Sequence, residues 1–342
     1  MTNAIVTFKD VDIVFGDDPK SALPLIDAGK TRAQIQDDTG QILGVAGASF
    51  DIREGEVIVL MGLSGSGKST LLRAVNGLNP VIRGSVEVRD GDNRIDPATC
   101  SAEELRHLRR RRIAMVFQQF ALLPWRTVAE NVGFGLELAG IPVREREAKV
   151  AEQLKLVGLD GWGEKYVHEL SGGMQQRVGL ARAFATDAPI LLMDEPFSAL
   201  DPLIRDRLQD ELLDLQKSLN RTIIFVSHDL DEAAKIGSRI AIMEGGRVIQ
   251  LGTPQEIVKN PATPYVADFV GHMNPLNVLR AKDIMRSASA ADASEKSVTC
   301  SPDTPLRQVI QLKRKSKSAV CVEEGGSVVG VINEMDLLDC MA

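Results

Sequence analysis

The sequence predicts an α/β fold built on a parallel sheet, followed by a second and smaller α/β unit. Three observations lead to this prediction. Apolar runs of strand length recur at 56–61, 190–193 and 222–227, as expected for buried parallel strands. A glycine-rich loop follows the first run, and an amphipathic helix is expected between the second and the third. The pattern then changes at about residue 276, after a connection interrupted by proline and glycine.

The glycine-rich loop GLSGSGKST, at 62–70, satisfies the pattern G-x-x-x-x-G-K-[ST]. Its glycines let the backbone bend until successive N–H groups point at phosphate oxygens. Lys68 adds a positive charge there, and the Ser69 hydroxyl is suited to ligating Mg²⁺. A strand before the loop and a helix after it favour a phosphate site over a chance match in a glycine-rich turn. The residues expected to bind the nucleotide are Gly62, Ser64, Gly65, Ser66, Gly67, Lys68, Ser69 and Thr70.

Polar side chains follow the other two strands. Asp194 and Glu195 end the run Ile190-Leu191-Leu192-Met193, at the edge of a parallel sheet where ligands bind. We assign Asp194 to Mg²⁺, through water, and Glu195 to activating the attacking water. An acidic pair after a strand is often only a turn or a helix cap, but here it accompanies a phosphate loop. His228 closes the third strand and is expected to hydrogen-bond the γ-phosphate, although a lone histidine is usually structural.

The amphipathic helix between these strands has leucines on one face, and we interpret that stripe as core. Its members are Leu208, Leu212, Leu215 and Leu219.

Composition fits a soluble protein. The chain has 342 residues, of which 44% are hydrophobic and 25% are charged. Its net charge of −7 does not suggest a nucleic-acid partner. No apolar stretch approaches the roughly 18 residues that span a bilayer, and the first residues lack the layout of a signal peptide. The four cysteines show no C-x-x-C spacing, which argues against zinc and against a disulfide framework.

The segment LSGGMQQR, at 170–177, has the features of half of a nucleotide site. Ser171 is a natural N-cap, and two glycines then lead into a helix expected from Met174 to Ala185. This helix N-terminus is able to hold phosphate, yet it has no lysine and no metal ligand of its own. An ordinary glycine-preceded helix start is the alternative.

Together these motifs resemble the ABC-transporter ATPase family. GLSGSGKST is similar to its phosphate loop, LSGGMQQR to its signature motif, and ILLMDE to its acidic strand. Ser198-Ala199-Leu200-Asp201 is similar to the D-loop, His228 to the switch histidine, and Gln118 in MVFQQF to the loop glutamine. All six occur in the family's order, across roughly residues 5 to 255.

The resemblance implies a P-loop NTPase fold, with a RecA-like core, a helical subdomain and an antiparallel β subdomain. It also implies a head-to-tail homodimer in which the signature of one chain covers ATP held by the other chain's Lys68. The signature residues expected at that nucleotide are Ser171, Gly172, Gly173 and Gln175, with Asp201 crossing the interface. Gln118 is implied at the Mg²⁺ and the attacking water. Phe15 is the candidate for stacking on adenine, although a core role for this aromatic has near-equal odds.

Within the family, the chain resembles the ATPases of quaternary-amine importers, which take up glycine betaine, choline or proline betaine. The resemblance includes an insert at about 17–44, with a short helix at 28–35, and the segments 115–140 and 197–216. It implies a membrane permease docked near Gln118 to Arg126, a substrate-binding protein, and a peripheral place on the cytoplasmic face of the inner membrane. Trp125 is an anchor if it is exposed, and a core residue otherwise. The run Arg109 to Arg112 is interpreted as a solvated turn.

Rival interpretations remain at this point. One alternative is an ABC importer ATPase for another small solute, such as an amino acid. A second is a soluble ABC ATPase acting in DNA repair or translation. A regulatory module with a vestigial ATPase is the third, against which the intact Lys68, Glu195 and His228 argue.

We expect an ATPase domain over 1–270 and a separate unit over 276–342. In the second, strands are expected at 297–300, 318–322 and 328–332, with helices at 305–315 and 334–339. This pattern resembles one cystathionine-β-synthase (CBS)-type repeat. Because such repeats work in pairs, we expect two tails to pair across the ATPase dimer.

Two features of this tail suggest ligands. The segment 330–336 resembles a nucleotide-ribose motif, but Asn333 stands where serine or threonine is usual. A basic cluster could contact anionic lipid, although a solvated helix end is the simpler interpretation. Its members are Arg307, Lys313, Arg314, Lys315 and Lys317.

Overall fold

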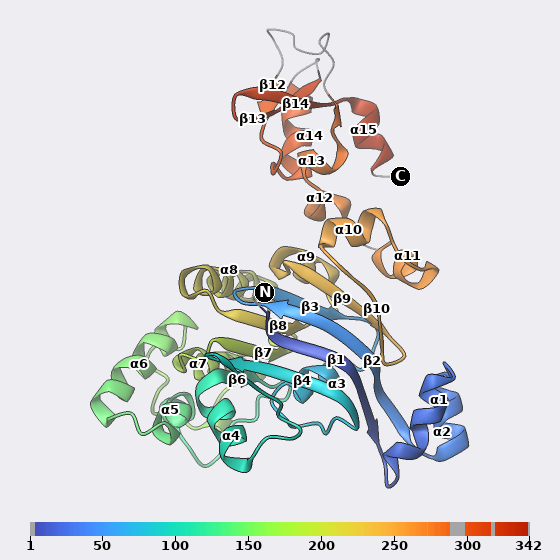
Figure 1. The fold of residues 1–342 in the computed structure, drawn as a ribbon. Coiled ribbons are helices and arrows are strands. Elements are labelled where there is room, and N and C mark those ends of the chain that lie inside the picture. The colour runs from blue at the N-terminus through green and yellow to red at the C-terminus, as the bar shows by residue number, and fades with distance from the viewer. Residues whose placement is uncertain (1–3, 272, 288–297, 316–318, 341–342) are drawn as a thin grey trace. The chain divides into compact units, whose positions relative to one another are not determined.

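The structure, a computed structural model, describes residues 4–271, 273–287, 298–315 and 319–340 (Figure 1). The chain forms two compact units. The first contains residues 1–228 and 241–249, and the second contains residues 229–240 and 250–342. The expected division near residue 270 therefore stays a proposal. No helix in the described part of the chain is long and apolar enough to cross a membrane.

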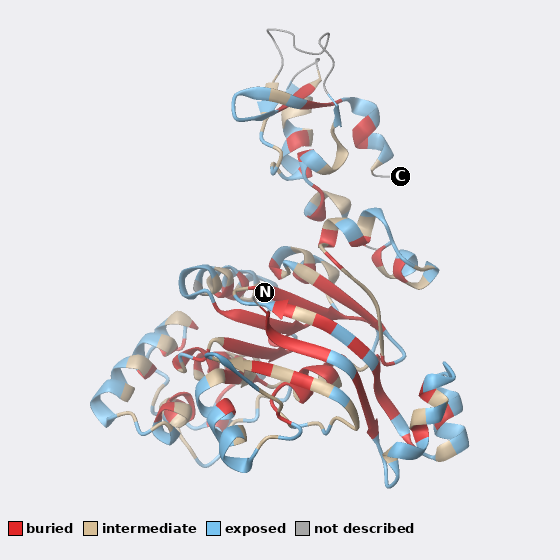
Figure 2. Ribbon diagram, viewed as in Figure 1, coloured by how far each residue is buried: buried red, intermediate tan, exposed pale blue. Residues whose placement is uncertain are grey.

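A six-stranded sheet forms the centre of the nucleotide-motif region. Its strands, in spatial order, are β10 (Arg247–Gly252), β9 (Arg239–Glu244), β3 (Val57–Met61), β8 (Thr222–Val226), β7 (Ile190–Asp194) and β6 (Ile113–Val116). Ile224 of β8 lies opposite Ile58 of β3 and Leu192 of β7, in parallel register. Every residue of β3, β7 and β8 is buried (Figure 2), which explains their uninterrupted apolar sequences. Parallel pairing brings the carboxyl ends of these strands to one edge.

A four-stranded antiparallel sheet completes the β-structure of the first unit. Its order is β2 (Ile42–Arg53), β1 (Ala4–Phe15), β4 (Arg83–Asp90) and β5 (Asn93–Ile95). Phe8 of β1 lies opposite Phe50 of β2, and the two rings pack with their centroids 4.7 Å apart. This is the predicted antiparallel β subdomain.

The helices of the first unit agree with the predicted pattern. Helices α5 (Val128–Leu138), α6 (Val143–Leu156) and α7 (Gly172–Ala185) pack against one another as the helical subdomain (Figure 1). The remaining elements are α3 (Lys68–Ala74), α4 (Ala102–His107), η2 (Leu108–Arg112), η3 (Val167–Glu169) and α8 (Pro202–Leu219). Leu208 and Leu212 of α8 are buried as predicted, whereas Leu219 is exposed. The side chain of Leu215 lies outside the described part.

The basic run at 109–112 is solvated as predicted, since Arg109, Arg110 and Arg111 are exposed, but it is not a turn. It forms the helical segment η2. Arg109 donates to the carbonyl oxygens of Asn76 and Gly77, at 2.9 and 3.1 Å. Arg112 pairs with Asp90 at 3.1 Å. Arg109 and Arg112 therefore connect this segment to neighbouring elements. The carbonyl groups that Arg109 contacts follow the end of α3, where backbone carbonyls lack partners within the helix.

The insert folds into η1 (Pro19–Ala22), α1 (Leu23–Asp27) and α2 (Arg32–Thr39). Helix α2 starts where Thr31 accepts from the backbone N–H of Gln34 in a capping box, and it ends at Gly40 in the left-handed conformation. The expected helix at 28–35 thus lies four residues further along. Gly29, with a φ of 71°, keeps residues 28–30 in a turn.

The second unit contains helices followed by a small mixed sheet. The helices are α9 (Leu230–Ile236), α10 (Pro254–Lys259), α11 (Pro264–Val270), α12 (Pro275–Val278), α13 (Ala281–Ile284), α14 (Leu306–Lys315) and α15 (Glu334–Asp339). The sheet order is β11 (Arg286–Ser287), β14 (Ser327–Ile332), β13 (Val320–Glu324) and β12 (Val298–Cys300). Each strand and helix expected after residue 297 is present within a residue or two. Lys317 of the basic cluster lies outside the described residues.

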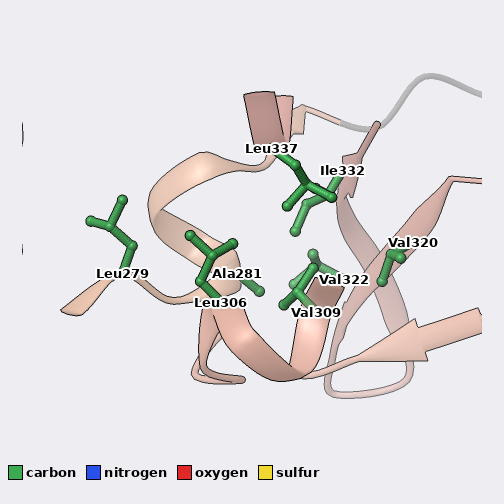
Figure 3. Packing of buried hydrophobic residues seen from close by; sticks show 8 residues of the cluster. All are labelled: Leu279, Ala281, Leu306, Val309, Val320, Val322, Ile332 and Leu337. Atoms are coloured by element: carbon green, nitrogen blue, oxygen red, sulfur yellow. The ribbon is translucent and has the colours of Figure 1, made fainter. Parts of the chain in front are cut away.

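The core of this tail is aliphatic. Buried side chains from its helices and strands meet between α14 and the sheet (Figure 3), namely Leu279, Ala281, Leu306, Val309, Val320, Val322, Ile332 and Leu337. Asp336 of α15, 6% exposed, is the carboxylate of the ribose-like motif. Arg286 donates to its Oδ1, and the backbone N–H of Asn333 donates to its Oδ2 at 2.8 Å. Both oxygens thus have partners within the tail.

We expect Asp336→Ala to destabilise the tail by about 1–2 kcal/mol, because the change removes a helix cap together with an ion pair whose arginine is largely exposed. Amide hydrogen exchange over residues 327–339 should accelerate accordingly. Asp339→Asn is the control, since Asp339 is 68% exposed and its carboxylate lies 4.0 Å from Arg286. Equal exchange in both variants would contradict a structural role for Asp336.

Candidate functional site

A pocket of about 430 Å³ lies at the carboxyl edge of the parallel strands in the first unit. Its position follows from the topology, because β3, β7 and β8 deliver their following residues to the same edge. The lining residues are Arg32, Gly44, Ser64, Gly65, Gly67, Lys68, Ser69, Thr70, Gln118, Glu195 and His228. Most of these residues belong to the predicted nucleotide set.

The phosphate loop needs its glycines for steric reasons. Gly62 has a φ of 143°, and a Cβ there would lie 2.1 Å from the carbonyl oxygen of Met243. Gly67 has a φ of 101°, and a Cβ there would lie 2.4 Å from the carbonyl oxygen of Gly44. Side chains at either position would collide with backbone. The loop can therefore be this tight only with glycine.

Lys68 extends along this loop. Its Nζ donates to the carbonyl oxygens of Gly62 and Leu63, both at 2.9 Å, and the residue is only 7% exposed. Burial lowers the pKa of this amine, while the nearby carboxylates of Glu195 and Asp194 raise it. The lysine is thus held along the loop and lines the pocket.

Asp194 is fully buried at the end of β7, and both its oxygens have partners. The Ser69 hydroxyl donates to Oδ1 at 2.6 Å. Arg73 of α3 donates to Oδ2 at 2.8 Å. Arg73 thereby fixes the carboxylate so that its other oxygen faces Ser69.

Three predicted catalytic side chains meet in the pocket. The Gln118 amide Nε2 donates to Glu195 Oε2 at 3.2 Å. His228 Nδ1 lies 3.5 Å from the same oxygen, and its side chain is 66% exposed. Glu195 has a φ of 48°, a left-handed conformation that strains a non-glycine backbone and is found mainly where the surroundings fix it. Its N–H donates to Val226 across the sheet at 3.2 Å.

Among the phosphate-loop and adenine-stacking candidates, Gly62, Ser66 and Phe15 do not line the pocket. Gly62 and Ser66 are buried members of the loop. Phe15 ends β1 and is 36% exposed. A Cβ on Gly44 would lie 2.9 Å from the Phe15 ring and 2.9 Å from the Thr70 methyl group, so the aromatic ring stands beside the pocket wall.

The signature residues lie outside this pocket, at the N-terminus of α7. Ser171 caps the helix by accepting from Met174 N–H at 3.4 Å. Gln175 donates to the carbonyl oxygens of Val167 and Leu170. Gly172 is exposed, and a Cβ on Gly173 would lie 3.3 Å from the carbonyl oxygen of Ala199. Asp201 caps α8 by accepting from Ile204 N–H at 3.0 Å. No part of this group completes its own chain's pocket.

The structure adds four residues that the sequence did not indicate. Arg32 and Gly44 line the pocket, and Arg73 holds Asp194. Gln176, 1% exposed, donates to the Glu195 carbonyl at 3.2 Å and accepts from Ala199 N–H at 3.0 Å. Gln176 therefore ties α7 to the segment that carries Glu195. The only sequence feature that could have indicated this role is the position of Gln176 within LSGGMQQR.

Known proteins are similar to both the first part and the last part of this chain. A family model described as "ABC transporter" matches residues 45–198, and one described as "CBS domain" matches residues 281–342. Among solved structures, a dimeric, post-hydrolysis state of the ATP-binding cassette MJ0796, bound to ADP and Pi, is similar. That chain is 31% identical, with a TM-score of 0.63 over 73% of this chain and 98% of its own.

Two curated relatives extend the similarity along the whole chain. The glycine betaine/proline betaine transport system ATP-binding protein ProV of Salmonella typhimurium is 49% identical, over 95% of this chain and 80% of its own. The trimethylamine N-oxide transport system ATP-binding protein TmoW of Pelagibacter ubique is 42% identical, over 99% of this chain and 97% of its own.

Proposed function

The chain belongs to the family of ABC transporter ATP-binding proteins, and we propose that it is the ATP-hydrolysing subunit of an importer for methylated amines. Membership in this family confirms the predicted resemblance and the predicted fold class, including the CBS-type tail. The observation that carries the ATP-hydrolysing part of the proposal is the meeting of Lys68, Glu195, Gln118 and His228 at one pocket on the carboxyl edge of the sheet.

Each residue has a distinct task in hydrolysis. Lys68 and the N–H groups of the phosphate loop neutralise the phosphate oxygens as charge develops on them. Glu195 Oε2 accepts a proton from the attacking water. Gln118 and His228, which both reach that oxygen, hold the water in line with the γ-phosphate. Phe15 stacks on the adenine ring.

The donor set beside the loop fits Mg²⁺. Ser69 Oγ and Asp194 Oδ1 are hard oxygen ligands only 2.6 Å apart, and Mg²⁺ takes few protein ligands besides phosphate and water. Ser69 would hold the ion directly and Asp194 through water, with Gln118 nearby. When bound, Mg²⁺ neutralises charge on the β- and γ-phosphates.

A second copy of the chain completes the site. The residues Ser171, Gly172, Gly173 and Gln175 present a helix N-terminus, and Asp201 lies beside them, but none lines the pocket of its own chain. A two-fold, head-to-tail dimer places this group over ATP on the partner's Lys68.

This arrangement predicts complementation between two inactive variants. Lys68→Ala and Ser171→Arg chains should each hydrolyse ATP poorly alone. Mixed in equal amounts, they should recover about a quarter of the wild-type rate, because half the dimers contain one intact composite site. Steady-state phosphate release measures this recovery. A mixture no more active than the sum of its parts would argue that each chain is a complete site.

The substrate class follows from the names of the relatives' transport systems and not from the pocket, which suits a nucleotide. Glycine betaine, proline betaine and choline are the first candidates, and trimethylamine N-oxide shares their methylated nitrogen. An importer of another small solute, such as an amino acid, or a soluble ABC ATPase is the alternative.

We place the permease contact at the segment from Gln118 to Arg126. An apolar groove of about 390 Å³ lies there, with Phe117, Leu123 and Phe134 in its lining. Trp125 is 71% exposed, which favours an anchor over a core residue. Docking there holds the subunit at the cytoplasmic face of the inner membrane, in an assembly that includes a substrate-binding protein and has no nucleic-acid partner.

The tail has apolar surface suited to pairing with a second copy. Met335 and Leu338 of α15 are 60% and 54% exposed, and Val329 of β14 is 36% exposed. We propose that two tails pair within the ATPase dimer. Tails that do not contact one another in the ATP-bound dimer would contradict this pairing.

Transport tests the function directly. The subunit purified with its permease and binding protein, reconstituted in proteoliposomes, should take up radiolabelled glycine betaine only with ATP. Choline, proline betaine and trimethylamine N-oxide serve as competitors, and an amino acid serves as the unrelated solute. Uptake of the amino acid alone would reject the amine importer, and hydrolysis with no associated permease would favour the soluble ATPase.

A further inference from the structure

The insert brings one positive charge into the nucleotide pocket. Arg32 is the first residue of α2, and it lines the pocket together with residues of the phosphate loop. Its Nη1 donates to the carbonyl oxygen of Gly65, an exposed residue of that loop. Arg32 is thus the single contribution of the insert helices to the pocket lining of the described chain.

The insert is fastened firmly enough to hold this side chain in place. Ala22, Ile26 and Ile35 are buried against Val14 and Leu43 of the antiparallel sheet. A bidentate ion pair joins Arg83 of β4 to Asp27 of α1, at 2.7 and 3.0 Å. Both ends of the insert are therefore fixed to the sheet.

Gln41 fixes the return of the chain after α2. Gln41 is only 8% exposed. Its side-chain amide accepts a hydrogen bond from the Asp18 N–H at 3.1 Å and donates one to the Thr39 carbonyl at 3.0 Å. Arg247 also donates to the Ile26 carbonyl, at 3.2 Å. The helix that carries Arg32 is consequently part of the folded unit, and not a loose loop.

The position of Arg32 is costly in the absence of an anion. The N-terminus of a helix carries partial positive charge, so a cation in the first turn is unfavourable there. Among the described residues, Arg32 makes no ion pair, and its hydrogen bond to the Gly65 carbonyl uses one of five guanidinium N–H donors. Lys68, in the same pocket, adds a second positive charge. Glu195 is the carboxylate in the same lining, so two cations face one anion there. The loop side of the pocket therefore suits an anion, with one wall supplied by the insert.

We propose that Arg32 binds the triphosphate of the nucleotide held by this phosphate loop. This inference rests on the proposed function, because it requires a nucleotide in the pocket. The Gly65 carbonyl orients the guanidinium, and its remaining N–H groups are free to donate to phosphate oxygens. A guanidinium suits this task, since its planar donors match phosphate geometry.

Phosphate is a better partner than the base for this side chain. Arg32 contacts Gly65, a member of the loop whose N–H groups surround phosphate. The candidate base-stacking ring, Phe15, stands instead beside Gly44 and Thr70. The insert therefore makes nucleotide affinity depend on a residue outside the shared nucleotide motifs.

Equilibrium binding of ATP, ADP and AMP to the purified full chain tests the proposal. Arg32→Ala should weaken ATP binding about 10-fold, ADP less, and AMP hardly at all, with an ATP defect that shrinks as salt rises. Arg32→Lys should recover part of the affinity, because it restores charge without the planar donors. Lys30→Ala, an exposed lysine of the insert outside the pocket lining, is the matched control and should bind normally.

Two other outcomes would overturn the proposal. An equal loss for all three nucleotides, together with a lower melting temperature, would mean that Arg32 only braces the loop or contacts the base. Unchanged ATP affinity in Arg32→Ala would also reject it. Lys68→Ala distinguishes a failure of the Arg32 proposal from a failure of the proposed function. If Lys68→Ala binds ATP normally, the phosphate loop is not the nucleotide site and the proposed function fails.

Discussion

Glu195→Gln is expected to lower the rate of ATP hydrolysis by about 1000-fold, or about 4 kcal/mol, while leaving ATP binding intact. Glutamine nearly preserves the size of the side chain but cannot accept a proton from the attacking water. Gln118 and His228 both reach Glu195 Oε2, so they are placed to orient that water but not to replace the base. Single-turnover hydrolysis separates the chemical step from binding.

Glu147→Gln is the matched control, because Glu147 is exposed on α6 and lies outside the pocket lining. It should hydrolyse ATP at the wild-type rate. A Glu195→Gln chain that turns over ATP normally would remove Glu195 from the role of base.

Lys68→Ala is expected to weaken ATP binding by about 100-fold, since it removes a charge-assisted bond to the phosphates at a nearly buried position. It also leaves the carbonyl oxygens of Gly62 and Leu63 without their donor, so the loop is expected to loosen. Fluorescent nucleotide titration measures the loss in affinity.

The control for this variant is Lys155→Ala, which removes an exposed lysine from α6. Circular dichroism establishes that both variants are folded. Lys68→Ala binding within twofold of wild type would show that the amine does not hold phosphate.

The meeting of Glu195 and His228 at one pocket was predictable from the sequence, for a physical reason. Glu195 and His228 each follow a continuously buried strand, and parallel strands carry such residues to one edge. The phosphate loop is fixed by local sterics at Gly62 and Gly67, so its conformation is encoded within a few residues. Ser171 capping α7 is equally local.

Other parts of the site depend on packing between distant segments, which a single sequence does not encode locally. Arg32 reaches Gly65 only because the insert packs on the antiparallel sheet. Arg73 and Asp194 are separated by 121 positions in the sequence, and no sequence pattern predicts their contact. The role of the basic run at 109–112 was missed for the same reason, since the groups that Arg109 and Arg112 contact belong to other elements.

Light scattering of the Glu195→Gln chain, with and without ATP, tests most directly whether two chains close over the nucleotide. The account predicts a mass near 37.1 kDa without ATP and twice that mass with ATP and Mg²⁺. Adding Ser171→Arg to the same chain should abolish the dimer. A chain that stays at 37.1 kDa with ATP bound would contradict the shared site.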